Sequence, residues 1–210
     1  LYAAMRAAGL QVASLTLEPI AAMNAAIPAE LRLLNLALVD IGAGTTDIAL
    51  CKEGSVVGYT MATVAGDEIT EAIMQAFLVD FKTAENIKRN LGEKEEIRYR
   101  DILGMEETVA ASQVEEAIQP PLDRLAEAVA KQILSVNGVA PSAVFLAGGG
   151  SKLSGLREKI AVKLEMAENI NDQLEAVGFV NLGVEARPNL IVLNRTKMPA
   201  VLVEAGFINS

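Results

Sequence analysis

The chain contains no histidine, no tryptophan and a single cysteine, Cys51. Without histidine it lacks the usual general base near neutral pH and the commonest zinc ligand, so any chemistry must rest on carboxylates, hydroxyls, backbone amides and a bound cation. A lone cysteine cannot form an intrachain disulfide, which favours a reducing compartment. Aromatic residues make up only 4% of the chain. The core must therefore be built from Ala, Leu, Ile and Val, as is usual in α/β layers.

Basic clusters and long apolar runs are also missing. The formal net charge of −9 repels phosphodiester backbones, so we expect no nucleic-acid partner. The longest apolar runs, 36–39 and 143–147, are too short to cross a bilayer, and the first residues lack a signal-peptide pattern. With 51% hydrophobic residues in 210, the chain can bury a real core. We expect a soluble, cytoplasmic globular protein, and the start at Leu1 rather than Met suggests a fragment.

The hydrophobic pattern alternates between strand and helix periods and predicts an α/β fold. The expected strands are 12–17, 36–40, 47–52, 55–64, 97–99 and 143–147. The expected helices are 2–8, 19–26, 66–91 with a second short helix from about 84, 120–136 opened by a Pro-Pro pair, and a segment after 151 that runs to 164.

Three glycine-bearing turns carry the chemistry that the pattern suggests. The first, 42–46, joins two strands, whereas a dinucleotide-binding glycine loop leads from a strand into a helix, so a Rossmann fingerprint is excluded. Gly66 and Asp67 open a helix and could offer amides, and the glycines at 148–150 lie between a strand and a helix. Such turns can hold phosphates through backbone amides, while Asp40 at a strand end can hold magnesium through water.

Each of these features has a plain structural alternative. A glycine turn with two threonines is ordinarily a tight hairpin, and a glycine cluster before a helix can be a simple helix entry. An aspartate at a strand end is often a cap. Glu85 and Lys88, three residues apart on one helix face, could be a solvated surface pair. The order and spacing of the features together favour a nucleotide site.

The motifs are "SLTLEPIAAMNAA" (14–26), "LALVDIGAGTTDIALCKEGSVV" (36–57), "VAGDEITEAI" (64–73), "TAENIKRNLG" (83–92) and "AVFLAGGGSKLSGLREKI" (143–160). With these motifs the chain resembles the actin, sugar kinase and Hsp70 superfamily, and within it the bacterial cell-division FtsA family. The resemblance implies the C-terminal half of an actin-like, ribonuclease H-like ATPase fold. That fold is α/β, with a mixed sheet, a β-hairpin phosphate loop and flanking helices.

The resemblance also implies a set of binding residues, with ATP and magnesium as cofactors. It implies a second phosphate loop made of Asp40, Gly42, Gly44, Thr45 and Thr46. It implies contacts to the ribose and phosphates from Gly66 and Asp67, and to the ribose or adenine from Glu85 and Lys88. It implies an adenosine motif made of Gly148, Gly149, Gly150 and Ser151. Ala65 stands where the family often has Gly.

The first phosphate loop of the superfamily, an aspartate-containing glycine hairpin that faces the second loop, has no counterpart in this sequence. Hydrolysis at such sites depends almost wholly on positioning and charge stabilisation. We therefore expect weak nucleotide binding and little hydrolysis from this chain.

The last part of the sequence has a different character. Residues 168–210, and above all "TKMPAVLVEAGFINS", resemble the end of a zinc N-acetylmuramoyl-L-alanine amidase. This resemblance implies Glu204 as the catalytic acid/base, but a chain without histidine lacks the family's zinc ligands. We therefore expect a partial ATPase domain at 1–164 and an amidase-like, short α/β tail at 165–210. The alternative is a helix at 168–177 and strands at 190–193 and 200–204 that simply extend the sheet.

The function that this pattern favours is an ATP-binding, FtsA-type protein of bacterial cell division. The alternatives are a cell-wall amidase fragment, another actin-fold ATPase such as an Hsp70-like protein, and an inert fragment. The expected partners are the nucleotide, further copies of the protein and a tubulin-like division protein. The full-length protein would act at the inner face of the membrane at midcell, although this chain shows no basic amphipathic terminal helix that supports membrane contact.

Overall fold

The computed structural model describes residues 1–164 and 192–194. The strands are β1 (Leu36–Ile41), β2 (Thr46–Lys52), β3 (Ser55–Ala62), β4 (Glu96–Arg100), β5 (Glu106–Ala110), β6 (Ala143–Ala147) and β7 (Val192–Asn194). The helices are α1 (Tyr2–Ala7), α2 (Glu18–Ala26), α3 (Gly66–Phe77), α4 (Phe81–Asn90), α5 (Ala111–Asn137) and α6 (Leu156–Lys163). Short 3-10 turns occupy Leu31–Leu33 and Gly149–Lys152.

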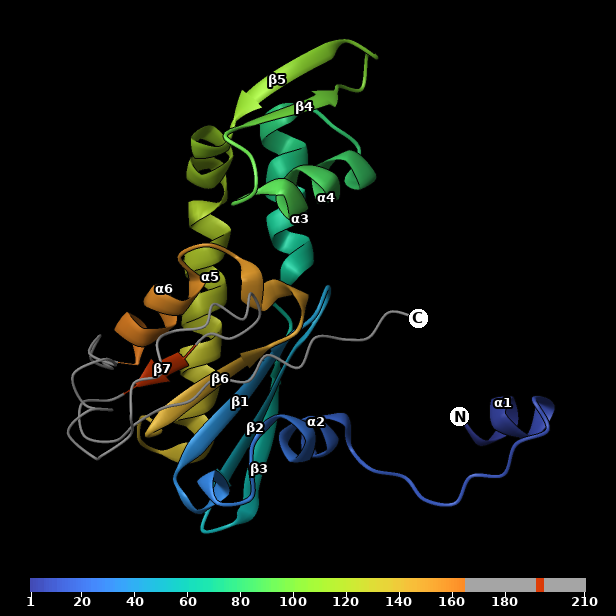
Figure 1. The fold of residues 1–210 in the computed structure, drawn as a ribbon, viewed down its shortest axis with the longest axis vertical. Coiled ribbons are helices and arrows are strands. Elements are labelled where there is room, and N and C mark those ends of the chain that lie inside the picture. Colours follow the sequence, from blue (N-terminus) through green and yellow to red (C-terminus); the bar gives the residue numbers. More distant parts are fainter. Residues whose placement is uncertain (165–191, 195–210) are drawn as a thin grey trace, which may run out of the picture.

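A mixed five-stranded sheet in the order β3-β2-β1-β6-β7 forms the lower part of the molecule (Figure 1). β1 pairs in parallel with β6, while β2 and β3 continue the sheet as antiparallel hairpins. β1 and β6 are almost wholly apolar and buried, as strands covered on both faces must be. The predicted α/β class and the mixed sheet are confirmed.

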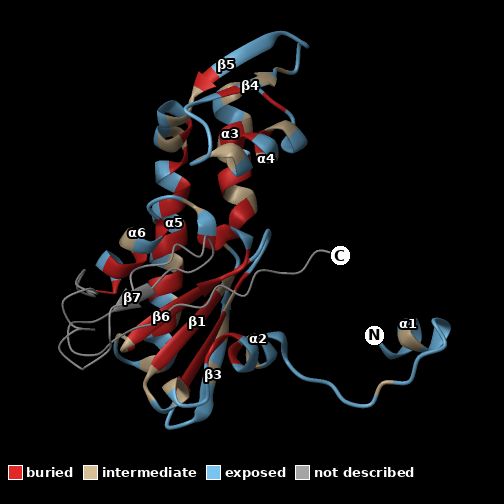
Figure 2. Ribbon diagram, in the orientation of Figure 1, coloured by how far each residue is buried: buried red, intermediate tan, exposed pale blue. Residues whose placement is uncertain are grey.

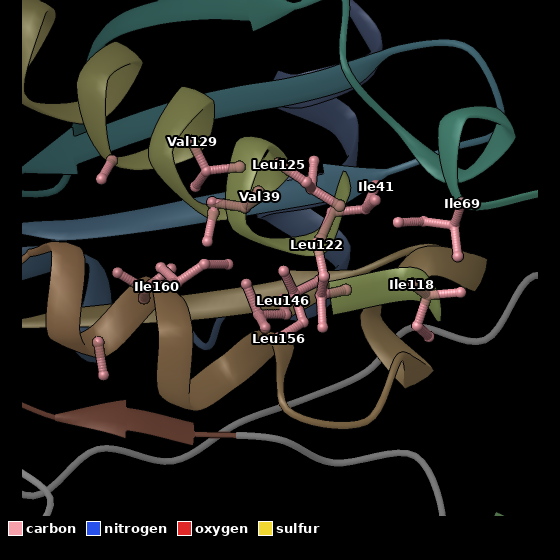
Figure 3. Close-up of a cluster of buried hydrophobic side chains, with 14 of the residues drawn as sticks. Val39, Ile41, Ile69, Ile118, Leu122, Leu125, Val129, Leu146, Leu156 and Ile160 are labelled. Carbon is pink, nitrogen blue, oxygen red and sulfur yellow. The ribbon is translucent and has the colours of Figure 1, made fainter. Parts of the chain in front are cut away.

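Helices cover the sheet on both sides. On one side, α5 and α6 bury Leu122, Leu125 and Ile160 against Val39 and Leu146 of the central strands (Figure 3). On the other side, α2 packs against β1 and β2 in a smaller cluster that contains Met23, Ile27, Leu38, Ala49 and Phe145. The two clusters alternate along β1 because successive side chains of a strand point to opposite faces.

A second lobe stands above the sheet and is formed by α3, α4, the β4–β5 hairpin and the first half of α5 (Figure 1). The ring of Phe77 meets that of Tyr99 edge to face at 6.3 Å. Buried residues run along α3 and α5 from one lobe into the other (Figure 2). These two helices therefore connect the lobes through a continuous apolar core.

Helix α5 is longer than the sequence predicts. It begins at Ala111, and Pro120 and Pro121 lie inside it rather than at its start. Prolines remove the amide donors for the carbonyls one turn earlier and are normally costly within a helix. Here the turns that precede them bury Val114 and Ile118 at helical spacing. Tertiary packing thus overrides the local proline signal.

The strand expected at 12–17 does not form. Residues 10–17 have no regular structure, and no residue of α1 is buried. A strand needs a neighbour that satisfies its amides and carbonyls, and none of the described strands pairs with this segment. Where the sequence predicts only one strand, at 97–99, the structure forms the complete β4–β5 hairpin.

The tail lies mostly outside the described residues, and this includes the helix expected at 168–177, the strand at 200–204 and Glu204. The described part, β7, pairs antiparallel with β6 and extends the sheet, as in the alternative interpretation of the tail. None of the helices in the described ranges is both long and apolar enough to cross a membrane.

Candidate functional site

The parallel pairing of β1 and β6 brings two of the predicted turns to one edge of the sheet. Asp40 lies opposite Ala147 in the register, so the hairpin tip after β1 and the triple glycine after β6 leave the sheet side by side. Gly148 has φ +79, and a Cβ there would collide with the Asp40 carboxylate and the Ile41 carbonyl. Glycine is therefore required where the two turns touch.

The hairpin tip exposes its backbone. Residues 42–45 are all exposed, and the amide of Gly42 donates to the Thr45 carbonyl at 2.9 Å. Thr45 keeps an exposed hydroxyl that donates to Asp47 at 3.3 Å. Thr46 differs from the expectation, because its side chain is fully buried and its hydroxyl donates to the Val64 carbonyl at 2.8 Å. Thr46 therefore fixes the hairpin and does not offer a donor to a ligand.

The start of α3 holds the hairpin tip in place. The amide of Gly66 donates to the Gly42 carbonyl at 3.0 Å, and the amide of Asp67 donates to the Ala43 carbonyl at 2.8 Å. The expectation that these two amides are offered to a ligand is not met, because the tip itself uses them. A Cβ on Gly66 would lie 3.0 Å from the Gly42 carbonyl oxygen, which explains the glycine at this close approach.

Glu85 and Lys88 of α4 join the same assembly. The Lys88 ammonium donates to the Gly66 carbonyl at 3.1 Å and to the Thr70 hydroxyl at 2.8 Å, and it lies 2.5 Å from the Glu85 carboxylate. The two side chains are only 14% and 24% exposed. They are therefore not a solvated surface pair, and they connect α4 to the turn that holds the hairpin.

The Glu85 carboxylate is held in its charged form. Burial opposes ionisation, but hydrogen bonds from Lys88 and Thr70, together with the charge of Lys88, outweigh it and lower the pKa of Glu85 below its ordinary value. An ionised carboxylate is an acceptor only. Glu85 is therefore a hydrogen-bond acceptor in this network.

Asp40 lies in the opposite electrostatic setting. Burial, and then the negative charges of Glu18 and Asp47, raise the pKa of Asp40 above its ordinary value. Such a carboxylate gains from a nearby cation. No group of three or more His, Cys, Asp or Glu side chains within 1–164 is arranged to hold a metal ion directly. Magnesium binding through water at Asp40 stays a prediction, and the structure shows this carboxylate partly buried near the charges of Glu18 and Asp47.

Glu18 is a site residue that sequence reasoning missed. It begins α2, followed by Pro19, and its charge acts on Asp40. The available signal was an acidic residue at the start of a helix that packs on β1, the strand that ends at Asp40. Its proximity depends on how α2 docks on the sheet, which local sequence does not specify.

The triple glycine turn is largely structural. Gly148 and Gly150 are buried against Asp40 and Ile41, while Gly149 is exposed. Ser151 is buried, and its hydroxyl donates to the Gly148 carbonyl at 2.7 Å. Within this glycine turn, only the backbone around Gly149 is therefore exposed and available to a ligand.

The structure brings the predicted segments together through direct contacts. The hairpin tip touches the start of α3, that start touches Lys88, and Gly148 touches Asp40. The mixed sheet, in which a glycine hairpin joins the inner strands β1 and β2, is a partial actin-like ATPase fold. Residues 2–186 match the family model described as MreB/Mbl protein. The chain belongs to the MreB/Mbl family of the actin-like ATPase superfamily.

Similar proteins come from several branches of this superfamily. The chain is 30% identical to the cell division protein FtsA of Pseudomonas aeruginosa over 79% of its length and 41% of the relative. It is 33% identical to the cell shape-determining protein Mbl of Bacillus subtilis over 64% of its length and 48% of the relative. The chain thus spans less than half of the length of these relatives.

Solved structures agree on the fold. A PilM-PilN type IV pilus biogenesis complex matches 77% of this chain and 43% of that chain, with a TM-score of 0.60 and 27% identity. MreB5 of Spiroplasma citri, bound to ADP, matches 75% of this chain and 54% of that chain, with a TM-score of 0.58 and 22% identity.

These findings confirm the predicted superfamily and fold. They do not single out FtsA, because FtsA and Mbl proteins match at similar identity. They also give no support to an amidase-like tail. The family match runs to residue 186, beyond the domain boundary expected at 164.

Proposed function

We propose that this chain is the half of an actin-like ATPase that holds the adenosine and one side of the polyphosphate. The observation that carries the proposal is that three turns, distant in sequence, meet near the carboxyl ends of β1 and β6. These turns are 42–45, 66–67 and 148–150. Support comes from the structures of MreB5 of Spiroplasma citri bound to ADP and to AMPPNP, which share this fold.

The hairpin tip is the proposed phosphate site. Within the part of the chain that the structure describes, no hydrogen bond uses the amides of Ala43 and Gly44. Neither residue is buried, so both amides can turn to an anion without a cost to the fold. The exposed Thr45 hydroxyl would exchange its 3.3 Å bond to Asp47 for the ligand, and the three donors together would be of the kind that bind phosphate oxygens.

Magnesium would lie near Asp40, whose carboxylate would hold it through water. A bound cation would offset the burial of the Asp40 carboxylate and the charges of Glu18 and Asp47, which together raise its pKa. When bound, the ion would neutralise charge on the polyphosphate. Glu85 would accept hydrogen bonds from the ribose hydroxyls, and the exposed backbone at Gly149 would lie against the adenosine.

Turnover by this chain alone should be low. Hydrolysis requires the first phosphate loop of the superfamily, which faces the hairpin at 42–46, and this sequence has no counterpart of that loop. Since the chain spans 41% of the FtsA relative, we propose that this half works with a complementary half. Nucleotide-dependent assembly in cell division, of the FtsA type, is the proposed role. It would act at the inner face of the membrane and pair with a tubulin-like protein.

A second candidate role is the maintenance of cell shape. It is favoured by the family model, which is that of MreB/Mbl proteins, and by the 33% identity to Mbl of Bacillus subtilis. Both roles use the same nucleotide half. They would be distinguished by binding to a tubulin-like division protein, which only the first role requires.

Calorimetric titration with MgATP tests the site. We expect weak binding, with a dissociation constant of about 0.1 to 1 mM, because only one of the two phosphate loops is present. Thr45→Val should weaken binding about 5- to 10-fold, the effect of one lost hydrogen bond. Thr108→Val, which removes an exposed hydroxyl from β5, is the matched control and should leave binding unchanged.

Two outcomes would contradict the proposal. Binding that Thr45→Val leaves intact would remove the hairpin tip from the site. Nanomolar binding by the unaltered chain would show that affinity does not need the first phosphate loop. It would contradict the proposal that this chain holds only one side of the polyphosphate.

A further inference from the structure

The edge strand β3 is the second surface of interest. β3 lies at the margin of the five-stranded sheet, and among the described strands it pairs only with β2 (Figure 1). Its other edge therefore presents backbone amides and carbonyls that no described strand uses. Such an edge is a template for a further strand.

The two faces of β3 differ sharply. On one face α5 lies so close to Gly58 that a Cβ would collide with Val136, and Thr60 donates to Gln132 at 2.7 Å. On the other face Tyr59 is 59% exposed and Met61 is 49% exposed. Figure 2 shows exposed residues on β3, whereas β1, two strands away in the sheet, is buried. The strand thus carries an uncovered apolar stripe next to its open edge.

The usual protections of an edge strand are mostly missing here. Residues 55–62 contain no charged residue and no proline, although natural edges are commonly blunted by both. One irregularity occurs near Val57, where the register with β2 shifts by one residue. The regular stretch from Gly58 to Ala62 remains open to pairing.

The chemistry of this edge indicates its occupant. We infer that β3 pairs antiparallel with β3 of a second copy of this chain, so that the two five-stranded sheets become continuous. An uncharged strand offers no charge that would select a basic or an acidic partner, and an antiparallel strand is complementary to itself about a twofold axis. The chain carries a net charge of −9, so two copies approach most easily where neither presents charge.

The pairing would place Tyr59 and Met61 of both copies on one face, where aromatic and apolar cross-strand contacts stabilise a sheet. The contact is small, since it comprises one short strand and its side chains, so the association should be weak. It needs no nucleotide, because none of its residues belongs to the hairpin tip or to the turns around it. An experiment can therefore contradict the β3 pairing without contradicting the proposed nucleotide site, and the reverse is also true.

Sedimentation velocity of the 210-residue chain without nucleotide tests the pairing. Between about 10 μM and 1 mM, the range for small contacts, the sedimentation coefficient should rise with concentration. Tyr59→Lys should weaken the association at least about tenfold, because it places one charge from each copy within the uncharged contact. Leu103→Lys, which adds the same charge at an 81% exposed apolar residue of the other lobe, should leave it unchanged.

Hydrogen exchange identifies the contact independently of the variants. Those amides of residues 58–62 that point away from β2 should exchange more slowly as the concentration rises, while the amides of the β4–β5 hairpin should not change. A chain that stays monomeric throughout, or association that survives Tyr59→Lys, would overturn the inference. So would concentration-independent protection of the β3 amides that point away from β2, because it would show that a segment of the same chain occupies the open edge.

Discussion

The site is held together in two different ways on its two sides. On the β6 side, Gly148 fits against Asp40 and Ile41 only because it has no side chain. On the α3 side, Gly66, Thr70, Glu85 and Lys88 form a network of hydrogen bonds and one ion pair. Steric fit tolerates no added atom, whereas a polar network weakens by degrees as its members are removed. The two sides should therefore respond differently to mutation, salt and pH.

The largest effect is expected on the steric side. Gly148→Val adds a β-branched side chain at φ +79, where it would overlap the Asp40 carboxylate and the Ile41 carbonyl. The free energy of unfolding should fall by about 3 kcal/mol or more, from backbone strain and overpacking together. Denaturant titration measures this change. The control is Gly149→Ala, one residue along the same turn, where nothing lies within 4 Å of an added Cβ.

If Gly149→Ala destabilised the fold as much as Gly148→Val, the turn would be intolerant as a whole, and the close approach to Asp40 would not be the cause. A near-neutral Gly149→Ala beside a strongly destabilised Gly148→Val assigns the effect to that contact.

An intermediate effect is expected on the polar side. Lys88→Met removes the donor to Gly66 and Thr70 and leaves the Glu85 carboxylate, 24% exposed, with only the exposed Arg89 as its cation. We expect a loss of about 1 to 3 kcal/mol in the free energy of unfolding. Arg89→Met is the matched control, because Arg89 binds the same carboxylate from a 74% exposed position and should contribute less than about 0.5 kcal/mol.

Salt provides a second measure of the same contrast. The Lys88 contribution should persist in about 0.5 M salt because the pair is shielded from solvent, while the Arg89 contribution should vanish. Equal losses from both variants would mean that the interhelix bonds of Lys88 add nothing beyond a surface ion pair.

The sequence predicts those features of the site that depend on neighbouring residues. It does not predict those that depend on contacts between residues distant in sequence. The hairpin at 42–45 and the strand before it follow from local signals, namely glycines between two apolar runs. The burial of Thr46 and the use of the Gly66 and Asp67 amides by the hairpin tip depend on how α3 docks, which no local pattern encodes. The same holds for Pro120, where the local proline rule was overridden by packing one turn earlier.

The smallest effect concerns Asp40 and has the opposite sign. Because burial and the charges of Glu18 and Asp47 raise the pKa of Asp40 in the folded chain, its ionisation disfavours folding. Stability should therefore decline as the pH rises from the ordinary pKa of an aspartate through the raised folded value. The charge-free variant Asp40→Asn should remove this decline and stabilise the chain at pH 7 by less than about 1 kcal/mol.

The same substitution should weaken binding of MgATP, because the carboxylate that would hold magnesium through water is lost. Thermal unfolding from pH 4 to 8, with and without MgATP, measures both effects. Glu116→Gln, at an exposed position of α5, is the control and should change neither. A variant less stable than the parent at pH 7 would show that the Asp40 carboxylate supports the fold rather than straining it. Gain of stability with loss of ligand is the pattern expected of a carboxylate kept for binding at the expense of the fold.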